Sequence, residues 1–68
     1  MVKTQSRPEL EERLWTAAEL AERYGLSELT LRQWRWRGTG PRPVKIGRRP
    51  MYPQSEIARW ERERALAS

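Results

Sequence analysis

Seven basic residues and no acidic residue lie between Leu29 and Ser55, in a 68-residue chain that has fourteen basic and nine acidic residues in all. The net charge of +5 is therefore concentrated in the middle of the sequence. Guanidinium and ammonium groups at this density bind phosphates and other anions. Positive charge gathered in one stretch is typical of a chain whose partner is a polyanion, most often a nucleic acid.

The composition also excludes most catalytic chemistry. The chain has no Cys, no His and no Asp, so the usual zinc ligands, the usual general base and the Ser-His-Asp triad are all missing. The remaining Glu, Tyr, Ser and Lys residues form no pattern that indicates a site, and a chain this short has a small core with little room for a concave pocket. We therefore predict that the chain is not an enzyme and binds no cofactor or metal.

Two short helices are predicted to position the first of the basic residues. Thr16 followed by Glu19 has the spacing of a capping box, and it predicts a helix over residues 17–24. Gly25 stands where a left-handed residue would end that helix.

The same pattern repeats directly afterwards. Ser27 is a second cap, the helix that it begins is predicted over residues 28–37, and Gly38 ends it. Only Gly25, Leu26 and Ser27 separate the two helices. Two short helices joined by three residues that include a glycine indicate a helix-turn-helix. The second helix of such a pair enters the major groove of DNA.

This second helix has two different faces. Leu31 and Trp34 are apolar and three residues apart, so they are expected to pack on the first helix. On the opposite side, Arg32 can bind guanine and Gln33 can bind adenine through paired hydrogen bonds. A solvated basic face is the alternative interpretation. The residues expected to contact DNA from this helix are Glu28, Thr30, Arg32, Gln33, Arg35, Trp36 and Arg37, of which Arg35 and Arg37 suit phosphates.

A basic β-hairpin is predicted next. Two Gly and two Pro within residues 38–43 prevent the helix from continuing. The alternating residues 44–46 predict a strand, Gly47 and Arg48 suit a two-residue type II′ turn, and residues 49–52 form the returning strand. The tip of this wing can contact phosphates or enter the minor groove, and a basic surface loop is the alternative. The wing residues expected to contact DNA are Lys45, Arg48 and Arg49.

Two features of the hairpin depend on its pairing. Pro50 is expected to be tolerated because each strand of a two-stranded hairpin has a free edge. The length of the turn decides whether Met51 or Tyr52 points inward. The hairpin is too small to be stable alone, so it is expected to lean on the helices.

A last helix is predicted after Pro53. Ile57 and Trp60 share one face of it and are expected to close the core against Trp34 and the wing. Two ion pairs with i,i+3 spacing are expected on its surface, Glu56 with Arg59 and Glu61 with Arg64.

These parts predict a mainly α fold with a small β-hairpin, that is, a winged helix-turn-helix over residues 14–64. Residues 1–13 are expected to form a leader that is partly disordered or a short helix, and residues 65–68 are expected to fray.

Trp36 does not fit the inner face of its helix. It follows Trp34 by two residues and therefore points the other way. We expect it to pack beneath the wing, with contact to DNA and contact with a neighbouring protomer on adjacent DNA as the alternatives.

The order of these landmarks is similar to that of a known family. The stretch RLWTAAELAERYGLSELTLRQWRWRG, followed by PVKIGRRPMYPQSEIARWERE, resembles the small excisionase-like DNA-binding domains related to the MerR group. That family combines a capped short helix, a Gly-apolar-Ser turn, a Thr-Leu pair, a Gly stop, an IGR-type wing and an apolar-x-x-Trp motif. This chain offers them as Thr16, Gly25-Leu26-Ser27, Thr30-Leu31, Gly38, Ile46-Gly47-Arg48-Arg49 and Ile57-Ala58-Arg59-Trp60.

The resemblance implies sequence-specific binding of double-stranded DNA. It favours a phage or prophage excisionase, a recombination directionality factor that bends attachment-site DNA, works with an integrase and associates with itself cooperatively on DNA. A small AlpA-like transcriptional regulator is the alternative. A cytoplasmic, nucleoid-associated location is expected, since the sequence has neither a membrane span nor a secretory signal.

A different class of function is also open at this point. The four Trp residues could serve a protein-interaction adaptor, and the basic stretch could bind RNA. RNA readers usually stack bases on aromatic residues of a sheet, and the sequence predicts no such sheet.

Overall fold

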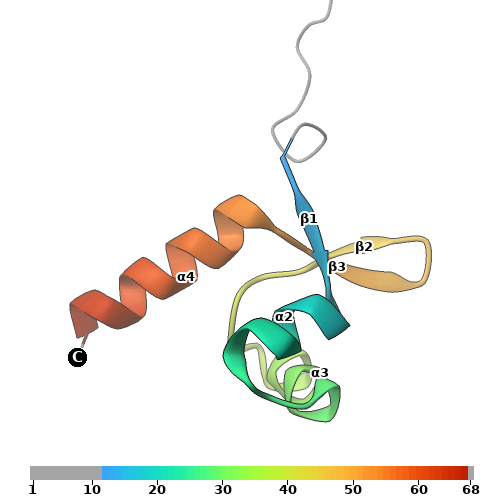
Figure 1. The fold of residues 1–68 in the computed structure, drawn as a ribbon, viewed down its shortest axis with the longest axis horizontal. Coiled ribbons are helices and arrows are strands. Elements are labelled where there is room, and N and C mark those ends of the chain that lie inside the picture. The colour runs from blue at the N-terminus through green and yellow to red at the C-terminus, as the bar shows by residue number, and fades with distance from the viewer. Residues whose placement is uncertain (1–11, 68) are drawn as a thin grey trace, which may run out of the picture.

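Three helices and three short strands make up residues 12–67, the part of the chain that the computed structural model describes (Figure 1). In chain order they are β1 (Leu14–Thr16), α2 (Ala17–Tyr24), α3 (Glu28–Arg37), β2 (Val44–Ile46), β3 (Arg49–Pro53) and α4 (Gln54–Ala67). The turn between β2 and β3 and the C-terminal end of α4 project toward opposite sides in Figure 1. The fold is the predicted winged helix-turn-helix.

Local capping interactions determine both ends of α2. The Oγ1 atom of Thr16 accepts a hydrogen bond from the Glu19 N–H at 3.0 Å, and Oε1 of Glu19 accepts one from the Thr16 N–H at 3.0 Å. Gly25 ends the helix in the left-handed region, with φ of 67°. The predicted capping box and the predicted range 17–24 are both confirmed.

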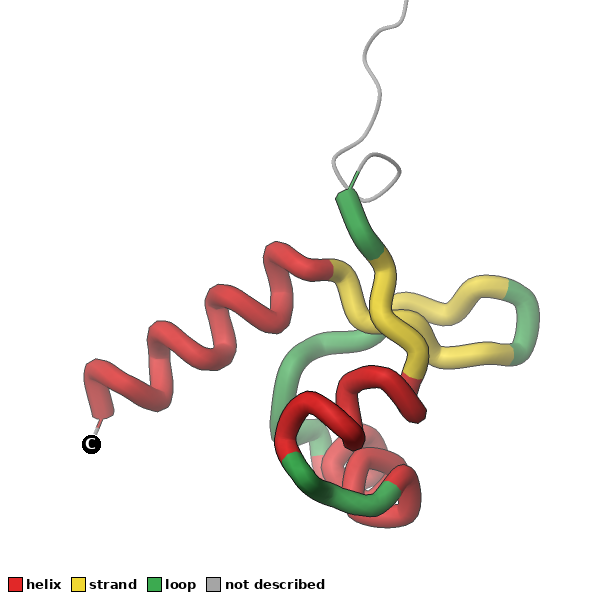
Figure 2. Tube along the Cα trace, in the orientation of Figure 1, coloured by secondary structure: helices red, strands yellow, loops and turns green. Residues whose placement is uncertain are grey.

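Capping interactions of the same kind determine both ends of α3. Oγ of Ser27 accepts a hydrogen bond from the Thr30 N–H at 3.1 Å, and Gly38 ends the helix with φ of 78°. The chain between α2 and α3 is a short loop, as Figure 2 shows. The predicted helix-turn-helix is therefore confirmed.

The sheet contains one strand more than the sequence predicted. Its order is β1-β3-β2, and β3 pairs antiparallel on both sides. Ile46 pairs with Arg49, so Gly47 and Arg48 form the predicted two-residue turn. Gly47 has φ of 64° and Arg48 has no positive φ, as a type II′ turn requires. The strand β1 was missed because three residues are too few to show an alternating pattern.

Pro50 is tolerated for a different reason from the one expected. Because β3 is the central strand, it has no edge that is free along its whole length, and only the part of it at Pro50 is unpaired on one side. The pair that closes a two-residue hairpin is hydrogen-bonded and the following pair, here Lys45 with Pro50, is not. The nitrogen of Pro50 therefore points away from β2, and the pairing of β1 with β3 stops at Met51. The ring removes no hydrogen bond from the sheet.

The chain around β1 joins the sheet to the start of α4. Trp15 pairs with Tyr52 in the sheet, and its Nε1 donates to Oε1 of Gln54 at 2.8 Å. The Glu12 carboxylate accepts hydrogen bonds from N and Oγ of Ser55 at 2.6 and 2.9 Å. A carboxylate in this position caps the N-terminus of α4 and suits the helix dipole.

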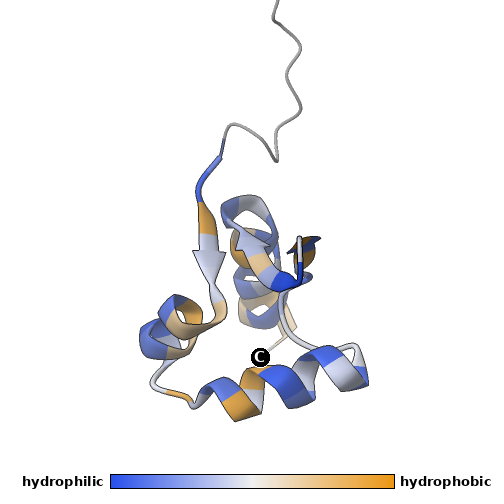
Figure 3. Ribbon diagram, turned by 90° about the vertical axis from the view of Figure 1, so that its right-hand side faces the viewer, coloured by the Kyte–Doolittle hydropathy of each residue, from blue (hydrophilic) through white to orange (hydrophobic). Residues whose placement is uncertain are grey.

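The core takes side chains from every helix and from β3. Tyr52, and not Met51, is the residue of the returning strand that points inward, with 1% of its surface exposed. Short apolar and hydrophilic segments alternate along the helices (Figure 3), as expected where each helix buries only one face. The buried side chains are Leu20, Ala21, Leu31, Tyr52 and Ile57, with Trp15, Ala17, Tyr24 and Trp34 packed partly buried against them.

Aromatic rings hold α4 against the two shorter helices. The ring of Trp60 lies 5.6 Å from that of Tyr24 and 5.4 Å from that of Trp34, measured between centroids. Ile57 is fully buried. The predicted burial of Ile57 in the core and the predicted contact of Trp60 with Trp34 are confirmed, whereas Trp60 itself lies outside the buried cluster.

A polar network reinforces this contact. The Glu61 carboxylate accepts a hydrogen bond from the Tyr24 hydroxyl at 2.6 Å and two from Arg23 at 3.0 and 3.1 Å. The expected pair of Glu61 with Arg64 is wrong, because Glu61 is engaged across the helix interface and the Arg64 guanidinium lies over the Trp60 ring. The expected pair of Glu56 with Arg59 is confirmed.

The loop after α3 passes close to Trp34. Gly40 has φ of 80°, and a Cβ atom at this position would lie 2.5 Å from Cε3 of Trp34. Both the backbone conformation and the space therefore require glycine. Because this loop leads from α3 into β2, the contact helps to set the direction of the wing.

At its C-terminal end, α4 continues to Ala67, past the boundary at residue 64 that the sequence suggested. The leader expected over residues 1–13 falls mostly outside the described residues. Within residues 12–67, no helix combines the length and the apolar composition that a bilayer crossing needs.

We predict that Leu31→Ala lowers the free energy of unfolding by about 2–5 kcal/mol, because it leaves a cavity in the core. Leu29→Ala is the matched control, since Leu29 lies on the same helix and is 59% exposed; its effect should stay within about 0.5 kcal/mol. Urea denaturation followed by circular dichroism measures both. Equal losses for the two variants would contradict the assignment of the buried face.

Stability should also fall in alkali through Tyr24. Burial and the hydrogen bond to Glu61 raise the pKa of Tyr24 to about 12, whereas an unfolded tyrosine titrates at about 10. Between these values the folded chain keeps a proton that the unfolded chain has lost, so the free energy of unfolding decreases as the pH rises. Tyr24→Phe should remove this part of the pH dependence in denaturation curves, and an unchanged slope above about pH 10 would argue against it.

Candidate nucleic-acid interface

The solvent-facing side of α3 carries both polar and apolar groups. Arg32, Gln33 and Arg37 are exposed, and Leu29 and Trp36 are 59% and 87% exposed. These five positions follow the spacing i, i+3, i+4, i+7 and i+8, so they share one helical face. Leu31 and Trp34 lie on the opposite, inward side. The structure therefore presents Arg32 and Gln33 together on an open surface, as the sequence predicted.

The other candidates on α3 lie in different surroundings. Glu28 is exposed in the first turn. Thr30 is half-buried, and its hydroxyl shares a hydrogen bond of 3.0 Å with Oγ of Ser27, so it belongs to the cap that begins the helix. Arg35 is also half-buried. The seven predicted residues thus do not form a single surface.

Arg35 is turned toward the sheet. Its Nη1 atom donates a hydrogen bond of 2.9 Å to the hydroxyl oxygen of Tyr52. Tyr52 was predicted from the sequence only as a possible inward residue, and its contact with Arg35 was missed. The two residues are seventeen positions apart, and no local pattern relates them. This hydrogen bond links α3 directly to β3, the strand that supports the wing.

The expectation that Trp36 packs beneath the wing is wrong. The wing lies on the side of α3 toward which Arg35 reaches. The next residue along an α-helix is rotated by about 100°, so Trp36 points away and remains 87% exposed. Contact with DNA and contact with a neighbouring protomer are the two alternatives left for this ring.

The wing presents the remaining predicted residues. Lys45, Arg48 and Arg49 are exposed on β2, on the turn and at the start of β3. Ile46, between them, is 53% exposed. The turn holds these cations at the end of the hairpin that projects farthest from α4 in Figure 1.

Four of the seven acidic side chains among residues 12–67 are engaged in contacts away from the basic residues of α3 and the wing. None of the partners described for them is one of the seven basic residues between positions 29 and 55, which therefore have no acidic partner among residues 12–67. Positive charge on α3 and on the wing is left available for an external anion. The pairs are Glu12 with Ser55, Glu19 with Thr16 and Arg13, Glu56 with Arg59, and Glu61 with Arg23 and Tyr24.

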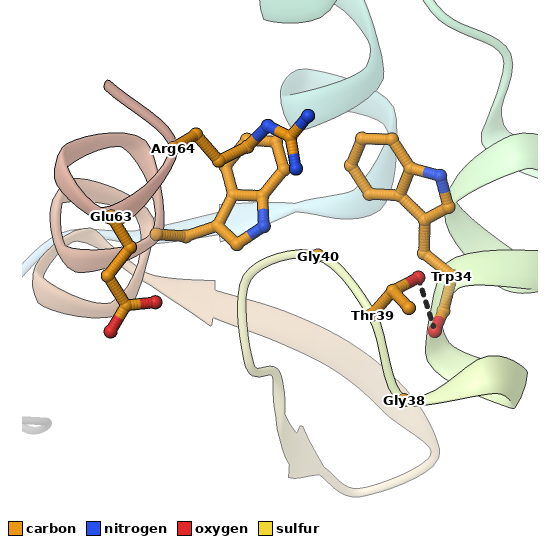
Figure 4. Close-up of a pocket in the computed structure, with 7 residues that line it drawn as sticks. Trp34, Gly38, Thr39, Gly40, Glu63 and Arg64 are labelled. Carbon is orange, nitrogen blue, oxygen red and sulfur yellow. Dashed lines mark hydrogen bonds between the residues drawn. The ribbon is translucent and has the colours of Figure 1, made fainter. Parts of the chain in front are cut away.

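A hollow of about 700 Å³ lies between the loop after α3 and α4 (Figure 4). The Arg64 guanidinium lies 5.2 Å from the centre of the Trp60 ring on one side of it, and Trp34 lines the other side. The hollow holds one cation and one carboxylate, that of Glu63, so it is not a second anion-binding surface. Residues 12–67 contain no group of three or more side chains of the types that hold a metal ion.

Comparison with known proteins gives one match. A family model described as a helix-turn-helix domain matches residues 16–65. The matched range begins at the cap of α2 and ends within α4, so it includes α3 and the whole wing. No curated protein and no solved structure matches the chain.

Proposed function

The chain belongs to the helix-turn-helix domain family and is a DNA-binding domain, and on this premise we propose that it binds double-stranded DNA sequence-specifically as an excisionase. In this function it binds and bends attachment-site DNA so that an integrase favours excision. The integrase is the proposed protein partner, and several copies associate cooperatively along the DNA. The family is typically non-enzymatic, in keeping with a role that supplies geometry rather than chemistry.

The observation that supports DNA binding most strongly is the separation of charge. The cations of α3 and of the wing have no acidic partner among residues 12–67, whereas Glu12, Glu19, Glu56 and Glu61 are engaged in contacts of the scaffold. Basic side chains without internal partners neutralise DNA phosphates and release the counterions held there.

The two basic elements have different tasks in this proposal. Arg32 and Gln33 are exposed on one face of α3, where the guanidinium can bind guanine and the amide can bind adenine in the major groove. Lys45, Arg48 and Arg49 of the wing hold the backbone or enter the adjacent minor groove. Readout by the helix and positioning by the wing together give specificity and orientation.

The excisionase role rests on the resemblance of the landmark residues between Thr16 and Trp60 to that family. An AlpA-like transcriptional regulator would use the same DNA-binding surface. The two roles therefore differ in what happens to the DNA after binding, and a functional assay has to separate them.

Binding should depend strongly on salt. If about six phosphates are neutralised, the logarithm of the affinity should fall with the logarithm of the salt concentration with a slope of about −5.

Arg32→Ala should reduce discrimination between a duplex selected from a random pool and its scrambled form, and Arg48→Ala should weaken binding to both equally. Arg62→Ala, which removes one exposed cation from α4, is the control. A flat salt dependence in fluorescence anisotropy would rule out the proposal, and the opposite pattern of variants would exchange the tasks of helix and wing.

The role after binding is tested by recombination. Purified protein added to an integrase encoded beside it, with the corresponding attachment sites, should increase excision and decrease integration, and footprinting should show protection within the attachment site. The Arg32→Ala variant should no longer change the balance of excision and integration, because Arg32 is proposed to read the bases of the attachment site. Protection of a promoter with no change in recombination would establish the regulator instead.

A further inference from the structure

A groove of about 470 Å³ separates the C-terminal half of α3 from the wing. Its composition is divided between cations and small apolar residues, and no acidic side chain lines it. One cation comes from the helix and two come from the wing, so the charge converges from both walls. The lining residues are Arg35, Lys45 and Arg48, with Pro43, Val44 and Pro50.

The helix wall of this groove is held in place by the core. Tyr52 is 1% exposed, with its ring among the buried residues, and its hydroxyl accepts a hydrogen bond from Nη1 of Arg35 at 2.9 Å. A guanidinium has five N–H donors, and this contact uses one of them. The remaining donors of Arg35 are thus presented in a fixed direction without the loss of side-chain freedom that an unrestrained arginine incurs on binding.

The wing wall is positioned by the same strand. Lys45 pairs with Pro50 of β3, and Tyr52 follows two residues later on β3. Residues two apart on a strand point to the same face of the sheet, so Pro50 in the groove and the Tyr52 side chain lie on one face. A single strand therefore sets the position of both walls.

This arrangement matches the chemistry of a nucleic-acid backbone. Phosphates repeat along one strand of a duplex and carry one negative charge each, which suits three cations on two facing walls. The sugars between them have apolar faces, which suit the Pro and Val side chains. The groove has no aromatic lining residue, so it offers no platform on which unpaired bases would stack.

We propose that this groove binds the sugar-phosphate backbone of one strand of duplex DNA and that Tyr52 is a positioning residue, which holds Arg35 for phosphate contact. The proposal rests on the proposed function, because a helix in the major groove and a wing at the adjacent minor groove leave one strand between them. It explains why Arg35 is directed toward the wing rather than toward the bases.

The test is a double-mutant cycle on DNA affinity, measured at several salt concentrations with a selected duplex and a random-sequence duplex. Arg35→Gln removes the charge, so the salt slope should become less steep by about 0.9, and the loss should be equal on both duplexes. Tyr52→Phe removes only the hydroxyl. It should leave the salt slope unchanged and weaken binding about three- to tenfold, but it should cause no further loss when Arg35→Gln is already present.

Two further variants keep the result interpretable. Arg35→Lys keeps the charge and loses the forked geometry of the guanidinium, so it should preserve the salt slope and reduce the affinity for DNA. It also tests the positioning of Arg35 if thermal denaturation shows that Tyr52→Phe does not fold. Arg62→Gln is the charge-matched control on α4 and should leave the affinity nearly unchanged.

Four results would overturn the inference. An unchanged salt slope for Arg35→Gln would mean that no phosphate occupies the groove. A loss for Tyr52→Phe of equal size with and without Arg35→Gln, or wild-type affinity of Arg35→Lys, would mean that Tyr52 has a structural role alone. If Arg35→Gln lost affinity only for the selected duplex, Arg35 would be assigned to base reading instead of phosphate contact. Absence of DNA binding by the unaltered chain would instead reject the proposed function, which distinguishes the two failures.

Discussion

The burial of Tyr52 is the contact on which the rest of the structure depends. Its ring lies in the core with residues from all three helices, and its backbone is part of β3, the central strand of the sheet. A hairpin with strands of three and five residues is not stable alone. This one aromatic side chain attaches the wing to the helices and, through its hydroxyl, to Arg35 of α3. The angle between the two basic elements is therefore a property of the core.

The small core places a second constraint on the molecule. A chain of this size buries a modest share of its surface, so contacts outside the core have to stabilise the position of α4. The tilted contact between the rings of Tyr24 and Trp60 and the hydrogen bonds of Glu61 to Arg23 and Tyr24 do this at the side of α4 that faces α2. None of these contacts uses a cation of α3 or of the wing, and those cations have no acidic partner within residues 12–67. Stability and the capacity for anion binding thus come from the same distribution of charge.

Trp34 and Trp36 lie two residues apart on α3 but have opposite surroundings, since Trp34 packs against the core and Trp36 faces solvent. Trp34 packs against the core and Trp60, and its ring is close enough to the following loop to require Gly40. Trp36, two residues later, is almost fully exposed beside Arg32 and Gln33. A large exposed ring on the face proposed to meet DNA gives that surface an apolar component in addition to its charge.

The sequence by itself determined the features that depend on neighbouring residues. The residues where the helices and the hairpin turn begin and end are specified locally, because capping bonds and positive φ values involve only neighbouring residues. These residues are Thr16 with Glu19, Ser27, Gly25, Gly38 and Gly47. The exposed pair Arg32 and Gln33 followed from helical periodicity alone. Tertiary structure decided the strand β1, the inward direction of Tyr52, its bond to Arg35, the exposure of Trp36 and the partners of Glu61. Each of these depends on residues far apart in the chain, and a side chain that has several acceptable partners is assigned one only when the elements are packed together.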